Sequence, residues 1–248
     1  MNNFDITNLE VKAKELRKKV LALGLEKGEF HIGGCFSEIE ILITLYDVIM
    51  QEEDKFILSK GHCCHPMYLL LKEKGYNPQI ISHPDIDEIN RIFCTTGSLG
   101  HGLPIGAGMA WARKIQGKPG NIYVLIGDGE SQEGSIWETI PLAVKHSLDN
   151  LVIIVDNNKL QAFDSAKDVS PMDFKKIFES FGCYVIDVNG HSFLELIMAL
   201  DKKVPGKPKV IIAETIKGKG ICFMENKPCW HAKIPNDEET KSAYVELE

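Results

Sequence analysis

The sequence predicts an α/β domain with a parallel central sheet and helices on both faces. The prediction rests on apolar runs of strand length: NIYVLI (121–126), LVIIV (151–155), YVIDV (184–188) and VIIAE (210–214). Helix-like segments occur between runs of this kind, a pattern typical of parallel strands buried on both sides. The 248 residues contain no internal repeat and no Pro/Gly/Ser-rich linker, which favours one domain over residues 1–248.

Composition excludes several classes of protein. The chain has 35 acidic and 28 basic residues, a net charge of -7, so we expect no nucleic-acid partner and no membrane partner. Its apolar runs are far shorter than the roughly 20 residues of a membrane span. The seven cysteines form no CxxC pair, which gives no indication of a zinc site or a disulfide framework. We therefore expect a cytoplasmic protein with reduced thiols.

The first half of the chain predicts helices before the sheet begins. Residues 1–20 form an amphipathic charged helix rather than a signal sequence. A second apolar-periodic segment covers 37–50, with Ser37 as the N-cap and Glu40 at capping-box spacing. A third helix is expected over 66–74.

The remaining elements follow in order. Residues 75–98 show little periodicity, and loops of this length are usually functional or disordered. Small residues over 103–115 predict a closely packed helix. Further helices are expected over 133–146 and 192–200, between the strands, and a charged terminal helix over 236–248.

Polar turns follow two of the predicted strands. Gly127, Asp128 and Gly129 follow the first, and Asn158 lies just after the second. Ligands of open parallel sheets bind beyond the carboxyl ends of the strands, so Asp128 and Asn158 should be neighbours in space. Their oxygens suit Mg²⁺ or Ca²⁺, and the glycines would let backbone N–H groups approach a phosphate.

Two alternatives compete with this interpretation. Both polar segments are favoured turn sequences and could be purely structural. A dinucleotide fingerprint is the other alternative, but Gln132 occupies the place of its third glycine and Asp128 would repel a bare pyrophosphate. A diphosphate bridged by a metal ion meets both objections.

Ordered sequence blocks resemble a known family. They are DKFILSKGH (54–62), TTGSLGHGLPIGAGMA (95–110), GDGESQEGSIWE (127–138), LDNLVIIVDNNKLQ (148–161) and FMENKPCWHAKIP (223–235). Together they resemble the N-terminal, diphosphate-binding part of transketolase, in the form where the enzyme is split into two chains. The resemblance covers nearly the whole chain and implies the thiamine diphosphate-binding fold.

The resemblance also implies a cofactor site. Asp128, Asn158 and the backbone carbonyl of Leu160 fall where the family binds its metal, Mg²⁺ or Ca²⁺. The residues at cofactor-binding positions for thiamine diphosphate are His62, Gly97, Leu99, Gly127, Asp128, Gly129, Glu130, Asn158 and His231.

Histidines supply the candidate catalytic groups. The resemblance places these in or near the substrate channel: His31, His62, His83, His101 and His231. Imidazoles suit proton transfer near neutral pH. The alternative is that each caps a helix or bonds within the core, and His101 is glutamine in many transketolases. The other histidines, His65, His146 and His191, are interpreted as structural or surface residues.

The expected activity requires a second chain. In the family, the glutamate that activates the cofactor and most groups that bind sugar phosphates belong to the pyrimidine-binding domain, which lies beyond the resemblance. We expect a partner subunit carrying that domain, a heterotetramer of two copies of each chain, and transfer of a two-carbon ketol unit from a ketose phosphate to an aldose.

Two other functions stay open. Cys63, Cys64 and Ala232 depart from the family pattern, which permits a different acceptor such as an activated sugar. A non-catalytic paralogue that binds the cofactor is the second possibility. We interpret Cys63 and Cys64 as small packing groups, with redox sensitivity as the alternative.

Overall fold

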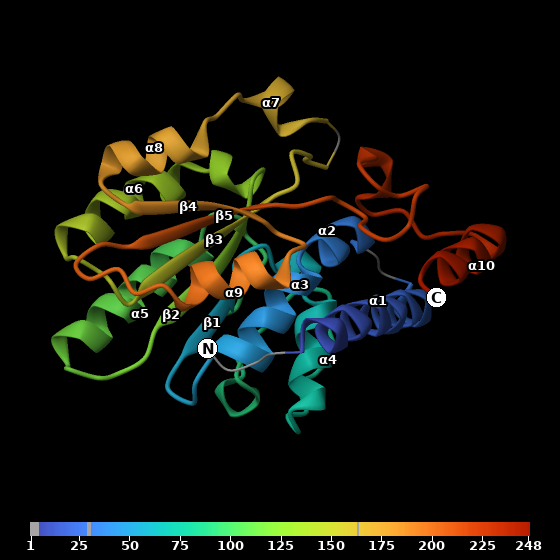
Figure 1. Ribbon diagram of the computed structural model, residues 1–248, viewed down its shortest axis with the longest axis horizontal. Coiled ribbons are helices and arrows are strands. Elements are labelled where there is room, and N and C mark those ends of the chain that lie inside the picture. Colours follow the sequence, from blue (N-terminus) through green and yellow to red (C-terminus); the bar gives the residue numbers. More distant parts are fainter. Residues whose placement is uncertain (1–4, 29–30, 163) are drawn as a thin grey trace.

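The computed structural model describes residues 5–28, 31–162 and 164–248, and its centre is a five-stranded sheet (Figure 1). Every strand pair is parallel, and the spatial order is β1-β2-β3-β5-β4. The strands are β1 (Lys55–Leu58), β2 (Ile122–Gly127), β3 (Leu151–Asn157), β4 (Tyr184–Asn189) and β5 (Lys209–Glu214). The predicted parallel sheet is confirmed; β1, inside the DKFILSKGH block, was not predicted.

Helices cover both faces of the sheet, as predicted. Their bounds are α1 (Ile6–Lys27), α2 (Ile32–Ser37), α3 (Ile39–Ile43), α4 (His65–Glu73), α5 (Gly102–Ile115), α6 (Gly134–Lys145), α7 (Ala166–Val169), α8 (Phe174–Phe181), α9 (Phe193–Asp201) and α10 (Asp237–Glu246). One face packs against α1, α3, α4 and α9, and the other against α5, α6 and α8.

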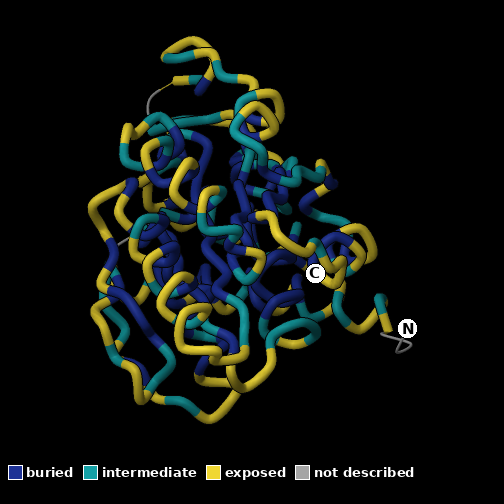
Figure 2. The backbone as a smooth tube through the Cα atoms, turned by 90° about the vertical axis from the view of Figure 1, so that its left-hand side faces the viewer, coloured by how far each residue is buried: buried dark blue, intermediate teal, exposed yellow. Residues whose placement is uncertain are grey.

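Alternation along the strands divides the core into two layers. In β2, Tyr123 and Leu125 enter the layer on the α1 side, whereas Val124 and Ile126 enter the layer on the α5 side. Figure 2 shows the buried strands at the centre of the molecule, with exposed residues around them. A sheet buried on both faces explains why its strands are continuous apolar runs.

Most predicted helices are confirmed. Those expected over 66–74, 103–115, 133–146, 192–200 and 236–248 are α4, α5, α6, α9 and α10. The helix expected over 1–20 is α1, capped by Asp5, whose side chain accepts from the Asn8 N–H; residues 1–4 of that prediction lie outside the described residues. Helix α8 was not predicted. Residues 75–98 contain a single 3₁₀ turn, Glu88–Asn90, and no longer helix or strand.

The prediction of one helix over 37–50 is wrong in detail. Ser37 ends α2, the short α3 follows, and Thr44–Ile49 is π-helical. Ser37 does not cap a helix: its hydroxyl donates to the Gly34 carbonyl at 2.9 Å and to Asp156 Oδ2 at 2.6 Å. The predicted capping box is absent because Ser37 and Glu40 both have buried partners elsewhere in the fold.

Glu40 is the centre of a buried ionic cluster. Its carboxylate accepts from both terminal nitrogens of Arg17 at 2.8 and 2.9 Å and from His191 Nδ1 at 2.9 Å. Burial opposes ionisation, but Arg17 and His191 outweigh it and lower the pKa of Glu40 to about 2. His191 is thus structural, as the sequence suggested, and it joins α3 to the loop before α9.

Replacing this carboxyl should destabilise the fold. Glu40→Gln leaves Arg17 buried without a counter-charge, so we expect the free energy of unfolding at pH 7 to fall by about 3–5 kcal/mol. The wild-type pKa lies below the ordinary 4.5, so the stability is present above pH 4.5 and is lost as the pH falls toward 2. Urea unfolding at several pH values measures both effects. Glu73→Gln, in a more exposed ion pair, is the control and should change stability by less than about 1 kcal/mol; equal losses would contradict the assignment.

Candidate functional site

The two polar turns meet at the carboxyl edge of the sheet. Gly127 in β2 pairs with Asp156 in β3, so the residues that follow each strand emerge side by side. The Lys159 N–H donates to Asp128 Oδ2, which ties the turn after β3 to the turn after β2. Asp128 and Asn158 are both buried and adjacent to this junction, as the sequence analysis expected.

The donor chemistry of this edge fits a hard divalent cation. Asp128 is 2% exposed, and burial, followed by the charge of Asp156, raises its pKa to about 7. Asn158 Oδ1 accepts from the Leu160 N–H at 3.1 Å, which folds the loop back so that Leu160 stays beside it. Carboxylate and amide oxygens retain free lone pairs for a cation. Among the described residues, no group of three or more His, Cys, Asp or Glu is arranged for a metal, so carbonyl and ligand oxygens would have to complete the shell.

A cavity of about 380 Å³ opens beside these turns. The predicted residues that line it are His62, Gly97, Leu99, Gly127, Asp128, Gly129, Glu130, Asn158, Leu160 and His231. The structure therefore brings the predicted cofactor and metal positions to one cavity.

Three of the predicted histidines form a cluster at this cavity. The ring centroids of His31 lie 5.2 Å from His62 and 5.2 Å from His231, and those of His62 and His231 are 5.5 Å apart. Burial lowers the pKa of His31, with a further contribution from the neighbouring His62. Burial and the Lys217 ammonium lower the pKa of His231 to about 4. Such rings are neutral at physiological pH and can donate or accept hydrogen bonds.

Of this cluster, His62 and His231 line the cavity, whereas His31 contacts them without being a lining residue. His83 and His101 belong neither to the lining nor to the cluster. The His83 ring packs against Gly97, where an added Cβ would lie 3.2 Å from it, and its Nδ1 lies 3.4 Å from Ser82 Oγ. His101 is exposed at the residue before α5 and has no side-chain capping hydrogen bond.

Both carboxylate oxygens of Glu130 accept hydrogen bonds from the protein itself. Its Oε1 accepts from the Ser59 hydroxyl and from the Gly100 N–H at 2.8 Å, and its Oε2 accepts from the Gly127 N–H at 3.1 Å. Burial raises its pKa, against these hydrogen bonds. Glu130 thus fixes the glycine turn and the segment before α5 relative to one another.

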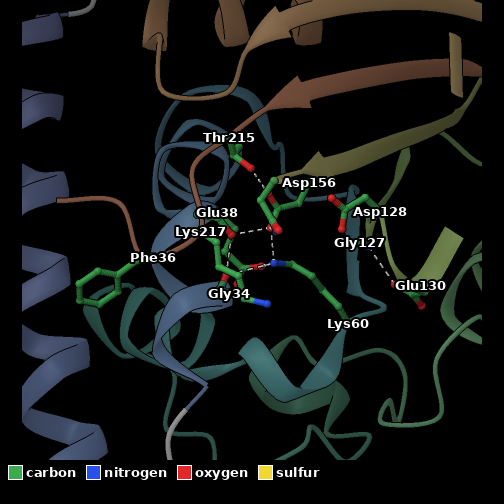
Figure 3. A network of polar contacts seen from close by, with 12 residues as sticks. Gly34, Phe36, Glu38, Lys60, Gly127, Asp128, Glu130, Asp156, Thr215 and Lys217 are labelled. Atoms are coloured by element: carbon green, nitrogen blue, oxygen red, sulfur yellow. Dashed lines mark hydrogen bonds and ion pairs between the residues drawn. The ribbon is translucent and has the colours of Figure 1, made fainter. Parts of the chain in front are cut away.

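A buried ionic network, shown in Figure 3, adjoins the cavity, which Lys60 lines. Lys60 Nζ lies 2.5 Å from Asp156 Oδ2 and 2.8 Å from Glu38 Oε2, and it donates to the Gly34 carbonyl at 3.0 Å. Thr215 Oγ1 donates to the other oxygen of Asp156. Burial favours the neutral amine of Lys60, but Asp156 and the other acidic neighbours outweigh burial, so the pKa of Lys60 is raised.

One cation faces two carboxyl groups in this network. Burial raises the pKa of Glu38 well above its ordinary value, and the Lys60 charge only partly opposes this. Glu38 Oε1 has no hydrogen-bond partner among the described residues. The protonated form of Glu38 is therefore favoured, which leaves Lys60 to balance Asp156.

Sequence reasoning missed the lysines of this site. Lys60 immediately precedes Gly61-His62, and Lys217 lies in TIKGKG just after β5. Both lysines follow the carboxyl end of a strand, where open parallel sheets bind their ligands, and this placement could have identified them as site residues. Glu38 carried no signal, because its pairing depends on the tertiary fold.

One of the two neighbouring cysteines, Cys63, also lines the cavity. Cys63 and Cys64 are fully buried, and an added Cβ on Gly34 would lie 2.4 Å from Cys63 Sγ. Cys64 Sγ donates to the Ile81 carbonyl at 3.3 Å. All the cysteines of the chain are unpaired.

A larger cavity, about 780 Å³, lies beside β5 and α8. Four of its charged groups form two ion pairs: Lys159 with Glu214 at 2.6 Å, and Lys175 with Asp187 at 2.5 Å. We place the candidate site in the smaller cavity because its polar groups converge on one space.

These features define an α/β domain with a polar, glycine-lined cavity beyond the carboxyl ends of its strands, where open parallel sheets bind their ligands. Residues 45–247 match the family described as "Transketolase, thiamine diphosphate binding domain". The chain belongs to the transketolase family. The predicted fold and family resemblance are confirmed, and the matching domain is a thiamine diphosphate-binding domain.

Individual relatives agree. An apulose-4-phosphate transketolase subunit of Actinobacillus succinogenes is 39% identical over 99% of this chain and 98% of its own length. The 6-deoxy-6-sulfo-D-fructose transketolase subunit SqwG of Clostridium sp. is 36% identical over 97% of this chain and 96% of its own length. The crystal structure of Campylobacter jejuni transketolase superposes with a TM-score of 0.88 at 28% identity, covering 98% of this chain but only 43% of that one. In the described part of the chain, no helix is long and apolar enough to cross a membrane.

Proposed function

We propose that this chain is the cofactor-binding subunit of a two-chain transketolase. With a partner subunit that carries the pyrimidine-binding domain, it transfers a two-carbon ketol unit from a ketose phosphate to an aldose. The proposal includes a heterotetramer of two copies of each chain, and the unpaired cysteines suit a cytoplasmic location.

One observation carries the proposal. The chain holds a diphosphate- and metal-type site, and the relatives that match it nearly end to end are named as subunits of transketolases. This chain covers only 43% of the Campylobacter jejuni transketolase, which is more than twice as long. The rest of the active site would therefore come from the partner.

The residues of this chain have distinct tasks in the proposal. Asp128, Asn158 and the Leu160 carbonyl hold Mg²⁺ or Ca²⁺, and the metal binds the diphosphate. Thiamine diphosphate supplies the electron sink for cleavage of the ketose. The other predicted cofactor contacts are His62, Gly97, Leu99, Gly127, Gly129, Glu130 and His231, of which Glu130 acts by holding the turn.

The histidines would act on the substrate. His31, His62 and His231 contact one another, and such imidazoles can hydrogen-bond to oxygens on which negative charge develops. His83 and His101 stay in the proposal as channel residues, to be completed by the partner subunit.

Reconstitution tests the proposal. The chain is mixed with a candidate partner protein that carries a pyrimidine-binding domain, together with Mg²⁺ and thiamine diphosphate, and aldehyde release from a ketose phosphate is followed. We expect turnover from the mixture, at least about 1,000-fold above either chain alone, because separated halves lack the cofactor activator. Full activity from this chain alone would contradict the proposal.

The names of the relatives favour a second candidate for the substrate. A donor panel should therefore include apulose 4-phosphate and 6-deoxy-6-sulfofructose beside ordinary ketose phosphates. Preference for one of these would define a specialised transketolase. Cofactor binding without turnover on any donor and acceptor pair would instead indicate the non-catalytic paralogue.

A further inference from the structure

Lys217 is a buried cation that joins two parts of the cavity. Its side chain is 3% exposed, and its Nζ donates to the Gln161 carbonyl at 2.8 Å and lies 3.1 Å from His231 Nδ1. Gln161 follows directly on Leu160, at the end of the proposed metal loop. Lys217 thus connects that loop to the histidine cluster.

The segment carrying Lys217 is held at several points. The Ile216 N–H donates to His191 Nε2 at 2.9 Å, and the Gly218 N–H donates to the Gly33 carbonyl at 3.0 Å. The lysine stem crosses Gly33, where an added Cβ would lie 2.9 Å from Lys217 Cγ. A side chain presented by such a fixed backbone over a glycine has little freedom, so its contact with His231 is built into the fold.

The hydrogen-bonding inventory fixes the role of each atom. Burial lowers the pKa of Lys217, whereas nearby acidic groups, including Asp128, raise it. In its ammonium form Lys217 has only donors, so His231 Nδ1 is the acceptor in this contact. A neutral imidazole carries one proton, which then resides on Nε2. Nε2 makes no hydrogen bond with any residue that the structure describes. It is therefore available to a ligand in the cavity that His231 lines.

We propose that Lys217 is a positioning residue that holds His231 in the Nε2–H tautomer, so that His231 offers the cavity an uncharged hydrogen-bond donor. The Nε2–H group of His231 fits an oxygen acceptor on the sugar substrate or on the cofactor. This assignment of the ligand rests on the proposed function. The low pKa of His231, about 4, supports the uncharged state across physiological pH. His231 thus stabilises oxygen charge without itself titrating there.

The tautomer of His231 can be determined directly by NMR. In the full chain labelled with ¹⁵N at histidine, long-range ¹H–¹⁵N spectra at pH 7.5 should show the proton of His231 on Nε2, with the signals assigned by comparison with His231→Gln. In Lys217→Met, which keeps the stem and removes the donor, we expect a mixture of tautomers. We also expect the His231 pKa to rise from about 4 toward the ordinary 6.5.

Lys219→Met is the matched control, two residues along the same segment, where the ammonium contacts Glu225 at 3.5 Å and is partly exposed. It should leave the His231 spectrum unchanged. A proton on Nδ1 in the wild-type chain, or an unaltered tautomer in a folded Lys217→Met chain, overturns the proposal. A wild-type proton on Nδ1 overturns the proposal even if Lys217→Met does not fold. Neither readout depends on transketolase activity, so the proposed function can fail separately.

Discussion

Asp128→Ala is expected to weaken binding of thiamine diphosphate by at least about 100-fold in the presence of Mg²⁺ and the partner subunit, equivalent to about 2.7 kcal/mol. The reason is that Asp128 is the sole carboxylate of the proposed metal set, whose other members are an amide and a carbonyl oxygen. Isothermal calorimetry with and without Mg²⁺ measures the loss. Removal of the metal from the wild-type enzyme with EDTA should have the same effect, and Mg²⁺ should restore binding to the wild type alone.

The variant should keep its fold. Burial of the Asp128 carboxyl is unfavourable, as its pKa of about 7 reflects, so its removal relieves desolvation while losing hydrogen bonds from Gly129 and Lys159. We expect the free energy of unfolding without metal to change by no more than about 1 kcal/mol. Asp201→Ala, an exposed aspartate at the end of α9, is the control. Unchanged Mg²⁺-dependent binding in Asp128→Ala would place the metal elsewhere.

Lys60→Met is expected to cause a large loss of stability. The substitution removes the cation between Asp156 and Glu38, and breaking a buried ion pair from one side costs about 3–5 kcal/mol. The folded state also favours a proton on Glu38 that the unfolded chain releases above about pH 4.5, so the free energy of unfolding should fall as the pH rises, in the variant as in the wild type. Urea unfolding between about pH 5 and about pH 8 measures both effects.

A second substitution tests whether the stability loss in Lys60→Met arises from unbalanced charge or from altered packing. Glu38→Gln alone should cost no more than about 1 kcal/mol because the neutral carboxyl is already favoured. Combined with Lys60→Met it should recover part of the lost stability. Lys159→Met, whose ammonium is exposed and paired with Glu214, should change stability by less than about 1 kcal/mol. A Lys60→Met chain as stable as the wild type would contradict the proposed charge balance.

Local pattern predicted the parts of the fold that depend on it. The apolar runs of β2 and β3, separated by a helix-like segment, predicted two adjacent parallel strands. The proximity of Asp128 and Asn158 could therefore be predicted, because both follow the carboxyl ends of these strands. Strand β1 was missed because its four residues are too few to show a period.

Tertiary pairing explains what the sequence could not predict. Ser37 and Glu40 have capping-box spacing, yet Asp156 and Arg17 bind them across the fold. The position of His101 outside the cavity could not be foreseen either, since a motif gives residue order and not side-chain direction. Lys60 was overlooked because an isolated lysine next to a glycine is most often a surface residue.

The histidine cluster joins segments from near both ends of the described chain, at His31, His62 and His231. During synthesis, the first two are made long before the third, so a chain that ends before residue 231 cannot assemble the triangle of rings. A proteolytic cut that releases the segment with His231 would remove one ring of the cluster while leaving the sheet, whose final strand ends at Glu214, with its strands complete.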